Sequence, residues 1–207
     1  IEKNHVEDTY EAVYTRITEE DVSTLKGLDD FSRVGEYYML AVEPAEQGYN
    51  ASYIYCDEET MYIARDQMRL LEGRLPQKED EVVVSRYFLS NYGADAGIGE
   101  KVMLSSESFH GEYTVTGIME GYKEKEVNGT SILLSKEALK GWSGYDPADY
   151  RAYVHFKNEQ QMDETELTAR SREIAKEYQL EMPVMNLSYM KFYKQPVNVS
   201  MLALEIG

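Results

Sequence analysis

Short segments of alternating apolar and polar residues dominate the first quarter of the chain. Such alternation predicts half-buried β-strands, because successive side chains of a strand point to opposite faces. The predicted strands cover residues 9–17, 32–43 and 50–56. Between the first two, Thr18 begins a segment that resembles a helix capping box, with Asp21 in place of the usual Glu or Gln. Val22 and Leu25 follow at helical spacing, so the pattern predicts a strand, a short helix and two further strands.

The next segment, residues 58–72, has the pattern of one amphipathic helix. Its apolar residues are three or four positions apart, a spacing that places them on one helix face: Met61, Ala64, Met68 and Leu71. We interpret this stripe as core packing rather than as a flexible partner groove. Gly73 is then expected to close the helix in a left-handed conformation, and Pro76 to prevent its continuation.

Residues 79–141 change in character and predict a compact β-rich insert. The predicted strands are 82–85, 101–105, 112–119 and 131–134. Short helices are expected at 86–92 and 136–140, and glycines at 93, 97 and 99 mark a loop.

The last part of the chain returns to the order found at its start. Residues 141–149 have the composition of a linker, and a strand follows at 150–156. Residues 163–178 predict a helix and 183–187 a further strand. Strand–helix–strand units at both ends favour a sheet with helices packed on one face. The predicted fold class is α+β, with the β-rich insert between the two units.

Composition supports a folded protein. Of the 207 residues, 43% are hydrophobic and 12% aromatic, which is enough apolar surface to form a core. No apolar run approaches the roughly 18 to 20 residues that a membrane helix needs, and no signal peptide is recognisable. Because the sequence begins at Ile1, we expect a mature product or an excised fragment of a longer protein.

The net charge limits the kinds of molecule that the protein can bind, and the cysteine content bears on its cellular compartment. A net charge of −17 disfavours binding to nucleic acid or to anionic lipid headgroups. The single cysteine, Cys56, rules out a disulfide within the chain. An exported protein without disulfides suits a Gram-positive cell surface, although a cytosolic protein would have the same composition. Cys56 lies in a predicted strand, so buried packing is favoured over reactivity.

Residue patterns that carry chemistry are missing from the sequence. His5, His110 and His155 lack metal-ligand spacing, and no cysteine accompanies them. The glycines at 93, 97 and 99 are not followed by the Lys-Ser or Lys-Thr of a phosphate loop, and no nucleophile elbow is found. We therefore predict no catalytic, cofactor-binding or metal-binding residues and no cofactor.

Carboxylates and tyrosines leave two questions open. The acidic runs 57–59 and 79–81 are typical of solvated surfaces, and the first of them also suits a helix start. A pair of catalytic acids would need one carboxyl in an apolar environment with a raised pKa. The 18 tyrosines, several of them on predicted strands, favour sheet packing over an exposed binding surface.

Four short motifs occur in order and carry a resemblance. They are LEGRLP at 71–76, DEVVVS at 80–85, GIGEKV at 97–102 and YTVTGI at 113–118. The sequence resembles the MacB-like periplasmic core domain of ABC transporter permeases of the FtsX-like kind, over about residues 8–195. The motif residues have structural roles: Arg74 is expected to pair with nearby acids or carbonyls, and Gly117 to let a strand bend or bulge.

The resemblance implies a two-lobed ectodomain. Residues 1–78 plus 142–207 would form a discontinuous, membrane-proximal α/β lobe of porter-like strand–helix–strand type. Residues 79–141 would form the β-rich insert lobe. In that family the ectodomain lies between the first two membrane helices, on the extracellular side of the cell membrane. Both chain ends would then leave the fold on one side.

The resemblance also implies a function and partners. The domain would be non-catalytic, would engage an extracellular substrate or partner protein, and would transmit motion driven by ATP hydrolysis. A separate cytosolic ABC ATPase would hydrolyse the ATP and act through the membrane region, and a second copy of the permease is a further expected partner. Two alternatives stay open: an independent secreted binding module and a carboxylate-dependent hydrolase.

Overall fold

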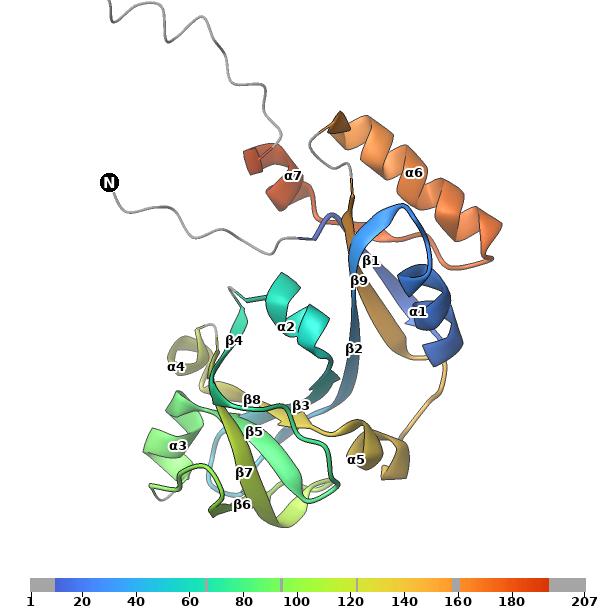
Figure 1. Ribbon diagram of the computed structural model, residues 1–207. Coiled ribbons are helices and arrows are strands. Elements are labelled where there is room, and N and C mark those ends of the chain that lie inside the picture. The colour runs from blue at the N-terminus through green and yellow to red at the C-terminus, as the bar shows by residue number, and fades with distance from the viewer. Residues whose placement is uncertain (1–9, 66, 94, 122, 158–160, 194–207) are drawn as a thin grey trace, which may run out of the picture.

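Ten strands and seven helices make up the described fold in the computed structural model (Figure 1), which describes residues 10–65, 67–93, 95–121, 123–157 and 161–193. The strands are β1 Ala12–Ile17, β2 Phe31–Pro44, β3 Asn50–Cys56, β4 Met68–Gly73, β5 Glu81–Ser85, β6 Lys101–Ser105, β7 His110–Gly121, β8 Gly129–Leu134, β9 Tyr150–Phe156 and β10 Val184–Met185. The helices are α1 Glu19–Lys26, α2 Glu58–Ile63, α3 Arg86–Tyr92, α4 Glu124–Val127, α5 Lys136–Gly141, α6 Glu164–Glu177 and α7 Leu187–Tyr193.

All ten strands belong to one sheet, and β2 connects its two halves. The strand order is β10-β1-β9-β2-β3-β8-β5-β7-β4, and β6 pairs with β7 beside this path. The first half of β2 pairs with β9, from Phe31 to Tyr37, whereas its second half pairs with β3, from Tyr37 to Pro44. One strand of 14 residues therefore passes from one half of the sheet into the other.

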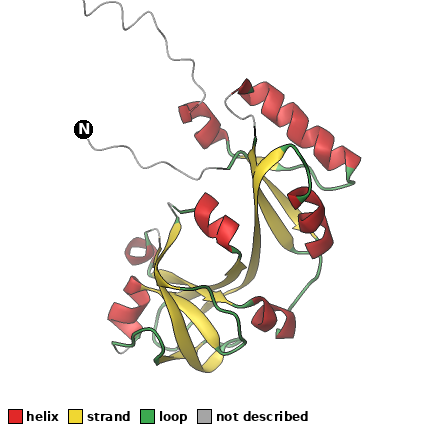
Figure 2. Ribbon diagram, viewed as in Figure 1, coloured by secondary structure: helices red, strands yellow, loops and turns green. Residues whose placement is uncertain are grey.

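One face of the first half of the sheet carries α1 and α6, as the pattern of the two chain ends predicts, whereas α2 packs on the other face of β2 at Gly35. Figure 2 shows α1 and α6 beside β1 and β9. The capping box at the start of α1 is confirmed: the Thr18 side chain accepts from the Asp21 backbone N–H, and Asp21 accepts from the Thr18 backbone N–H at 2.8 Å. The hydroxyl of Tyr14 on β1 donates to the Ser171 carbonyl of α6 at 3.0 Å, which joins sheet and helix.

The second half of the sheet curves back on itself. Its strands are β3, β8, β5, β7, β6 and β4, together with the end of β2. The loop after β2 meets the end of β6, where the Glu46 backbone N–H donates to the Ser105 carbonyl at 3.1 Å. Next to this contact, Tyr53 of β3 packs against Phe109 with ring centroids 4.4 Å apart.

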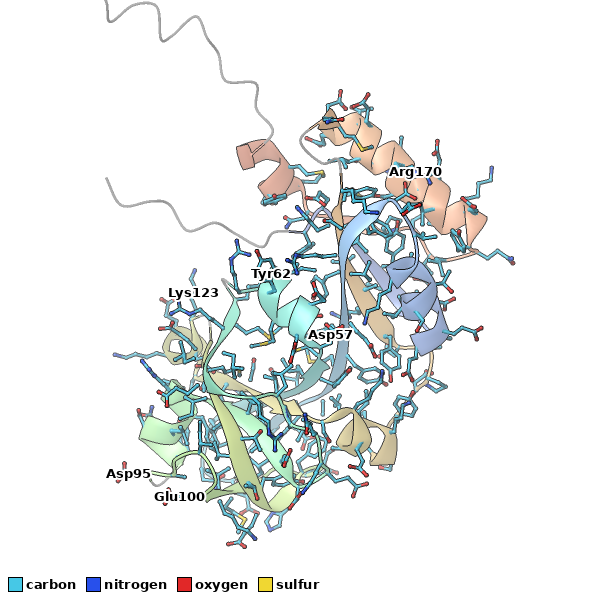
Figure 3. All side chains as sticks on the ribbon, viewed as in Figure 1. Asp57, Tyr62, Asp95, Glu100, Lys123 and Arg170 are labelled. Atoms are coloured by element: carbon cyan, nitrogen blue, oxygen red, sulfur yellow. The ribbon has the colours of Figure 1, made fainter. Side chains whose placement is uncertain are left out.

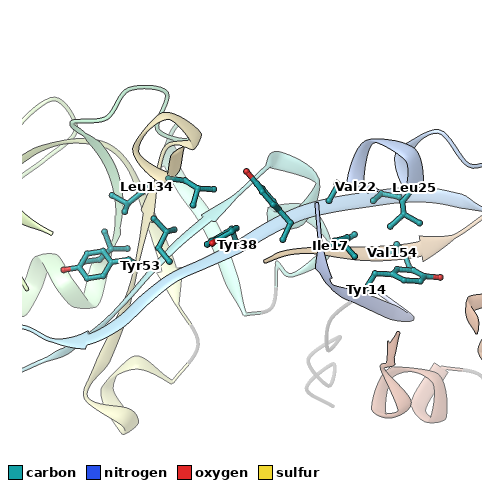
Figure 4. Close-up of a cluster of buried hydrophobic side chains, with 14 of the residues drawn as sticks. Tyr14, Ile17, Val22, Leu25, Tyr38, Tyr53, Leu134 and Val154 are labelled. Atoms are coloured by element: carbon teal, nitrogen blue, oxygen red, sulfur yellow. The ribbon is translucent and has the colours of Figure 1, made fainter. Parts of the chain in front are cut away.

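Buried side chains form one continuous cluster across both halves. Figure 4 shows Tyr14 and Val154 at one end of this cluster, Tyr38 near its middle, and Tyr53 and Leu134 toward its other end. A second cluster lies beneath α2 and β4; it contains Ile54, Cys56, Met61, Met68, Val83, Met119 and Leu133. Because the first cluster is continuous, hydrophobic burial holds the two halves together.

The prediction of one helix over residues 58–72 is wrong in its second half. The helix ends at Ile63, and Met68–Gly73 is the strand β4, which pairs with β7. Met61, Ala64 and Met68 are all buried in the second cluster, so the spacing identified buried positions. The spacing could not distinguish one helix from a helix followed by a strand, because β4 pairs with residues of β7 that are 44 or more positions away.

Gly73 has the predicted left-handed conformation, with φ of 81°, but it ends a strand and not a helix. A Cβ at this position would lie 2.2 Å from the Thr116 carbonyl oxygen, so only glycine allows β4 to approach β7 so closely. The prediction for Gly117 is confirmed, since the register of β7 against β5 shifts between Val115 and Gly117.

The other predicted elements largely occur. The helix predicted at 163–178 is α6, which begins after a second capping box at Asp163. The strand predicted at 183–187 is shorter, because only Val184–Met185 pair with β1 and α7 starts at Leu187. Within the described residues, no helix combines the length and apolar character needed to cross a membrane.

Candidate functional site

The residue types singled out for chemistry lie apart from one another. His110 is exposed at the start of β7, and His5 lies outside the described residues. His155 on β9 pairs with the fully buried Glu11, with Nδ1 2.9 Å from Oε1. Over the described ranges, no three His, Cys, Asp or Glu side chains group as they would around a metal ion. Cys56 is buried, as predicted, and burial raises the pKa of its thiol, which disfavours the reactive thiolate.

Several carboxylates are held firmly in the charged form. Hydrogen bonds from Arg74 lower the pKa of Glu81 to about 2, and a hydrogen bond from Arg170 lowers that of Asp30. Hydrogen bonds from Lys136 and Lys140 lower the pKa of Glu19. A catalytic general acid needs the opposite shift. These groups therefore do not support the hydrolase alternative.

The Arg74–Glu81 pair confirms the role expected for the arginine of the first motif. Two guanidinium nitrogens of Arg74 donate to the two carboxylate oxygens of Glu81 at 2.7 and 2.8 Å. The backbone N–H of Gln77 adds a third hydrogen bond at 2.8 Å. This bidentate arrangement closes the turn between β4 and β5, so the motif is structural.

The strongest candidate for a functional role is a network of charged side chains between α1, β2 and α5. We call it the charged junction; its members are Glu19, Lys26, Glu36, Asp57, Lys136 and Lys140. Figure 3 labels Asp57, which precedes α2. Three carboxylates and three ammonium groups balance each other. The junction thus joins elements from three separate parts of the chain.

Lys136 is at the centre of the charged junction. Its ammonium nitrogen lies 2.6 Å from Glu36 and 2.5 Å from Glu19. It also lies 5.5 and 5.8 Å from the ring centroids of Tyr55 and Tyr150, within cation–π range. Burial alone would lower the pKa of Lys136, but its bonds to the two glutamates outweigh burial and raise it. The lysine is therefore a fixed positive charge at neutral pH.

Glu36 connects the junction to the long strand. Its side chain is only 8% exposed, and Lys26 of α1 contacts it from the other side at 3.5 Å. Lys26 also bonds Asp57 at 2.8 Å, and Asp57 accepts the backbone N–H of Glu36 at 2.9 Å. A carboxylate this buried is stable only while its cations stay in place. Any displacement of α5 relative to α1 would disturb it.

Sequence reasoning missed the charged junction, although one signal was present. Lys136 and Lys140 are four positions apart, so they lie on the same face of α5, and both bond Glu19. Their partner in α1 is more than 100 positions away, so no local pattern identifies it.

The two ends of the described chain lie side by side. Ala12 of β1 pairs with Met185 of β10, at the edge of the sheet. The Asn186 side-chain amide donates to the Tyr10 carbonyl at 3.1 Å, and the Asn186 backbone N–H donates to the Glu11 carbonyl at 2.8 Å. Tyr10, the first described residue, and Asn186, which directly precedes α7, are therefore in contact.

Three solved structures have a similar fold. The extracellular domain of the ABC-type transporter YknZ from Gram-positive bacteria matches with a TM-score of 0.59 and 15% identity, over 84% of this chain and 98% of that one. A permease domain from Porphyromonas gingivalis matches with a TM-score of 0.56 and 16% identity, over 94% and 96% of the two chains. The periplasmic region of MacB from Actinobacillus actinomycetemcomitans matches with a TM-score of 0.57 and 10% identity, over 86% and 87%.

These comparisons define the class of fold. The chain has the fold of the extracellular and periplasmic domains of ABC transporter permeases, which include MacB and YknZ. The fold implied by the four sequence motifs is thereby confirmed. No family model matches the sequence, and no curated protein is detectably similar to it. At 10% to 16% identity the likeness is one of fold.

Proposed function

We propose that the chain is the non-catalytic extracellular domain of an ABC transporter permease, anchored at the outer face of the cell membrane by segments on both sides of it. The observation that carries this proposal is the permease-domain fold over most of the chain, combined with chain ends that lie side by side at Asn186. A domain inserted between two membrane helices needs both ends on one side.

The domain has two lobes in this proposal: residues 1–78 plus 142–207 near the membrane and residues 79–141 further out. The pairing of β4 with β7 and of β3 with β8 means that strands of the first part contribute to the outer half of the sheet. The inner lobe receives motion from a cytosolic ABC ATPase through the membrane region. The outer lobe engages an extracellular substrate or partner, and a second permease copy completes the assembly.

The charged junction is the element that we propose transmits the motion. Glu19 and Lys26 belong to the inner lobe, whereas Lys136 and Lys140 begin and continue the helix that follows the insert strands. A coupling element needs two arrangements whose balance a distant event can change. Ion pairs suit this role, because a shift of a few ångströms exchanges partners without exposing apolar surface.

Labelling of intact cells tests the location. Val42, which is 65% exposed, is replaced by cysteine in the whole permease. A membrane-impermeant maleimide should then label Val42→Cys in intact cells. The unsubstituted permease provides the background, and within this chain the single cysteine, Cys56, is buried. Labelling only after lysis would show that the domain is inside the cell and would overturn the proposal.

A reversible cross-link tests the coupling. Glu19 and Lys140 are bonded through the ends of their long side chains at 2.8 Å, so the two cysteines of the Glu19→Cys/Lys140→Cys variant can be joined by a reducible bismaleimide that spans the length of the replaced side chains. In the whole transporter, cross-linking should abolish transport and reduction of the cross-linker should restore it. The exposed Lys101–Glu112 pair of β6 and β7 provides the control, because both of its residues lie in the insert. Full transport by the cross-linked junction variant would disprove transmission through the junction.

A further inference from the structure

On the face of β2 opposite to the charged junction, arginine and tyrosine side chains gather. Because strand side chains alternate, Glu36 points to the junction while its neighbours point the other way. The strand register places Arg33 opposite His155, Gly35 opposite Tyr153 and Tyr37 opposite Arg151. Arg33 on β2 and Arg151 on β9 therefore lie on the same face of the sheet. Because Arg151 is opposite Tyr37, the two arginines are separated by four positions along the strand direction, or about 13 Å.

Helix α2 adds an exposed ring to this face, and the turn after it adds a third arginine. The Tyr62 ring, half exposed and labelled in Figure 3, has the Arg33 guanidinium 3.9 Å from its centroid and that of Arg65 at 5.0 Å. Stacking on a ring leaves the edge of a guanidinium free to donate hydrogen bonds. Tyr62 therefore presents two arginine side chains in a fixed position.

The positive charge of this face is only partly neutralised. Arg33 has a carboxylate partner, Glu59, at 2.7 Å. Arg65 donates to the Tyr62 carbonyl, and Arg151 stacks over Tyr37 at 5.7 Å. Neither Arg65 nor Arg151 forms an ion pair with any carboxylate in the described part of the chain. Among the described residues, Arg65 and Arg151 therefore have no carboxylate of this chain to compete with a ligand.

A tyrosine lies between the two ends of this face. Tyr153 is half-buried between Arg33 and Arg151 in the register, and its ring packs edge-on against Tyr10 at 4.9 Å and against Tyr37 at 5.6 Å. Tyrosine and arginine are the residues most enriched in protein-binding hot spots. The arrangement thus combines charge at both ends with an aromatic surface in the middle.

We propose that this arginine–tyrosine face, formed by Arg33, Tyr62, Arg65, Arg151 and Tyr153, binds an extended acidic polypeptide segment of a partner protein. The proposal rests on the proposed function, because it specifies the chemistry of the extracellular partner. Residues i and i+4 of an extended chain are also about 13 Å apart on one face. The segment would carry carboxylates at these two positions and an apolar side chain at i+2 over Tyr153.

A designed peptide pair tests the proposal. The probe is a fluorescent nine-residue peptide with Glu at positions 3 and 7, Leu at position 5 and Ser elsewhere; its control has Gln at positions 3 and 7. Fluorescence anisotropy with the 207-residue chain at low salt should show binding of the Glu peptide at least about tenfold tighter than that of the Gln peptide. Binding should weaken as the salt concentration rises, because exposed charges are screened.

Arginine variants locate the binding surface. The Arg65→Gln/Arg151→Gln variant should weaken binding of the Glu peptide about tenfold, since each exposed contact is worth about threefold. Arg69→Gln is the matched control, because Arg69 is an exposed arginine of β4 that already pairs with Glu120 at 2.7 Å. It should change binding by less than about twofold.

Four results would overturn the proposal. They are equal binding of the Glu and Gln peptides, equal weakening by the control variant, dissociation of a dimer of this chain by the double variant, and arginine-dependent binding of anionic vesicles without peptide binding. Each concerns only the isolated chain. Labelling of the whole permease in intact cells is independent of all four, so the failure of either proposal can be recognised separately.

Discussion

The two halves of the molecule are joined in two physically different ways. The continuous apolar cluster, from Tyr14 to Leu134, joins them by excluding water. The charged junction joins them through ion pairs centred on Lys136 and Glu36. Apolar burial has no preferred direction and depends little on salt, whereas ion pairs depend on partner, distance and pH.

The apolar cluster and the charged junction therefore have different effects on how firmly the two halves are joined and on how they can move. Exposing an apolar cluster to water costs free energy in proportion to the exposed surface, so the cluster opposes separation of the two halves. A charged network can exchange partners at small cost as long as each buried charge keeps a counter-ion. We infer that the cluster keeps the two halves together while the junction sets their relative position. Four variants test this division.

The largest loss should come from the apolar cluster. Leu25 of α1 is fully buried, so Leu25→Ala should lower the free energy of unfolding by about 2 to 5 kcal/mol through lost burial and a new cavity. Urea denaturation measures the change. The control is Leu187→Ala, at a position that is 46% exposed, which should change stability by less than about 1 kcal/mol. Similar losses for both would contradict the assignment of the cluster as the main stabiliser.

A smaller loss is expected where α2 packs on β2. A Cβ at Gly35 would lie 2.5 Å from the Thr60 hydroxyl oxygen and 2.8 Å from the Thr60 backbone, so Gly35→Ala should cost about 1 to 3 kcal/mol. Gly97→Ala is the control, because a Cβ added at Gly97 would come no closer than 3.7 Å to the Glu100 carboxylate, which is an ordinary contact. Thermal unfolding of both variants gives the comparison, and an unchanged melting temperature for Gly35→Ala would refute the close packing.

The junction should contribute less to stability than the cluster. Lys136→Met removes the cation between Glu19 and Glu36 and leaves the buried Glu36 with Lys26 alone, at a cost of about 1 to 3 kcal/mol. Lys101→Met, in an exposed pair with Glu112, should cost less than about 1 kcal/mol. The midpoints of urea denaturation, measured for both variants in low and in high salt, distinguish the two losses of stability. A loss of stability for Lys136→Met as large as that for Leu25→Ala would show that the charged junction stabilises the fold as much as the apolar cluster does.

The smallest effect concerns pH and an ion pair inside one half of the sheet. The bonds from Arg74 lower the pKa of Glu81 to about 2 from an ordinary value of 4.5. The stabilisation is therefore complete above pH 4.5 and is lost as the pH falls toward 2. Arg74→Gln should raise the titration midpoint of the Glu81 carboxyl, measured by NMR, and flatten the fall in stability over this range.

The control for this titration is Arg69→Gln, which removes another arginine 2.7 Å from a glutamate. It should leave the Glu81 midpoint unchanged. A Glu81 midpoint that stays near 2 in Arg74→Gln would show that the backbone N–H donors of Gln77 and Lys78 alone hold the carboxylate.

Local patterns predicted most elements correctly. The capping box at Thr18, the alternation in 112–119 and the helix after Asp163 each depend on neighbours within a few residues, so the sequence contains the full signal. The four motifs were also sufficient for the fold, because Gly73, Arg74 and Gly117 serve backbone geometry that a given fold requires at fixed positions.

Only the tertiary structure decided the rest. It split residues 58–72 into α2 and β4, because the partner of β4 is β7. It brought Lys136 to Glu19 and Glu36, and it placed Arg33, Tyr62 and Arg151 on one face. The physical reason is common to all three. Strand pairing and ion pairing act between residues that are close in space, whereas periodicity along a sequence reports burial and local element type and does not identify distant neighbours.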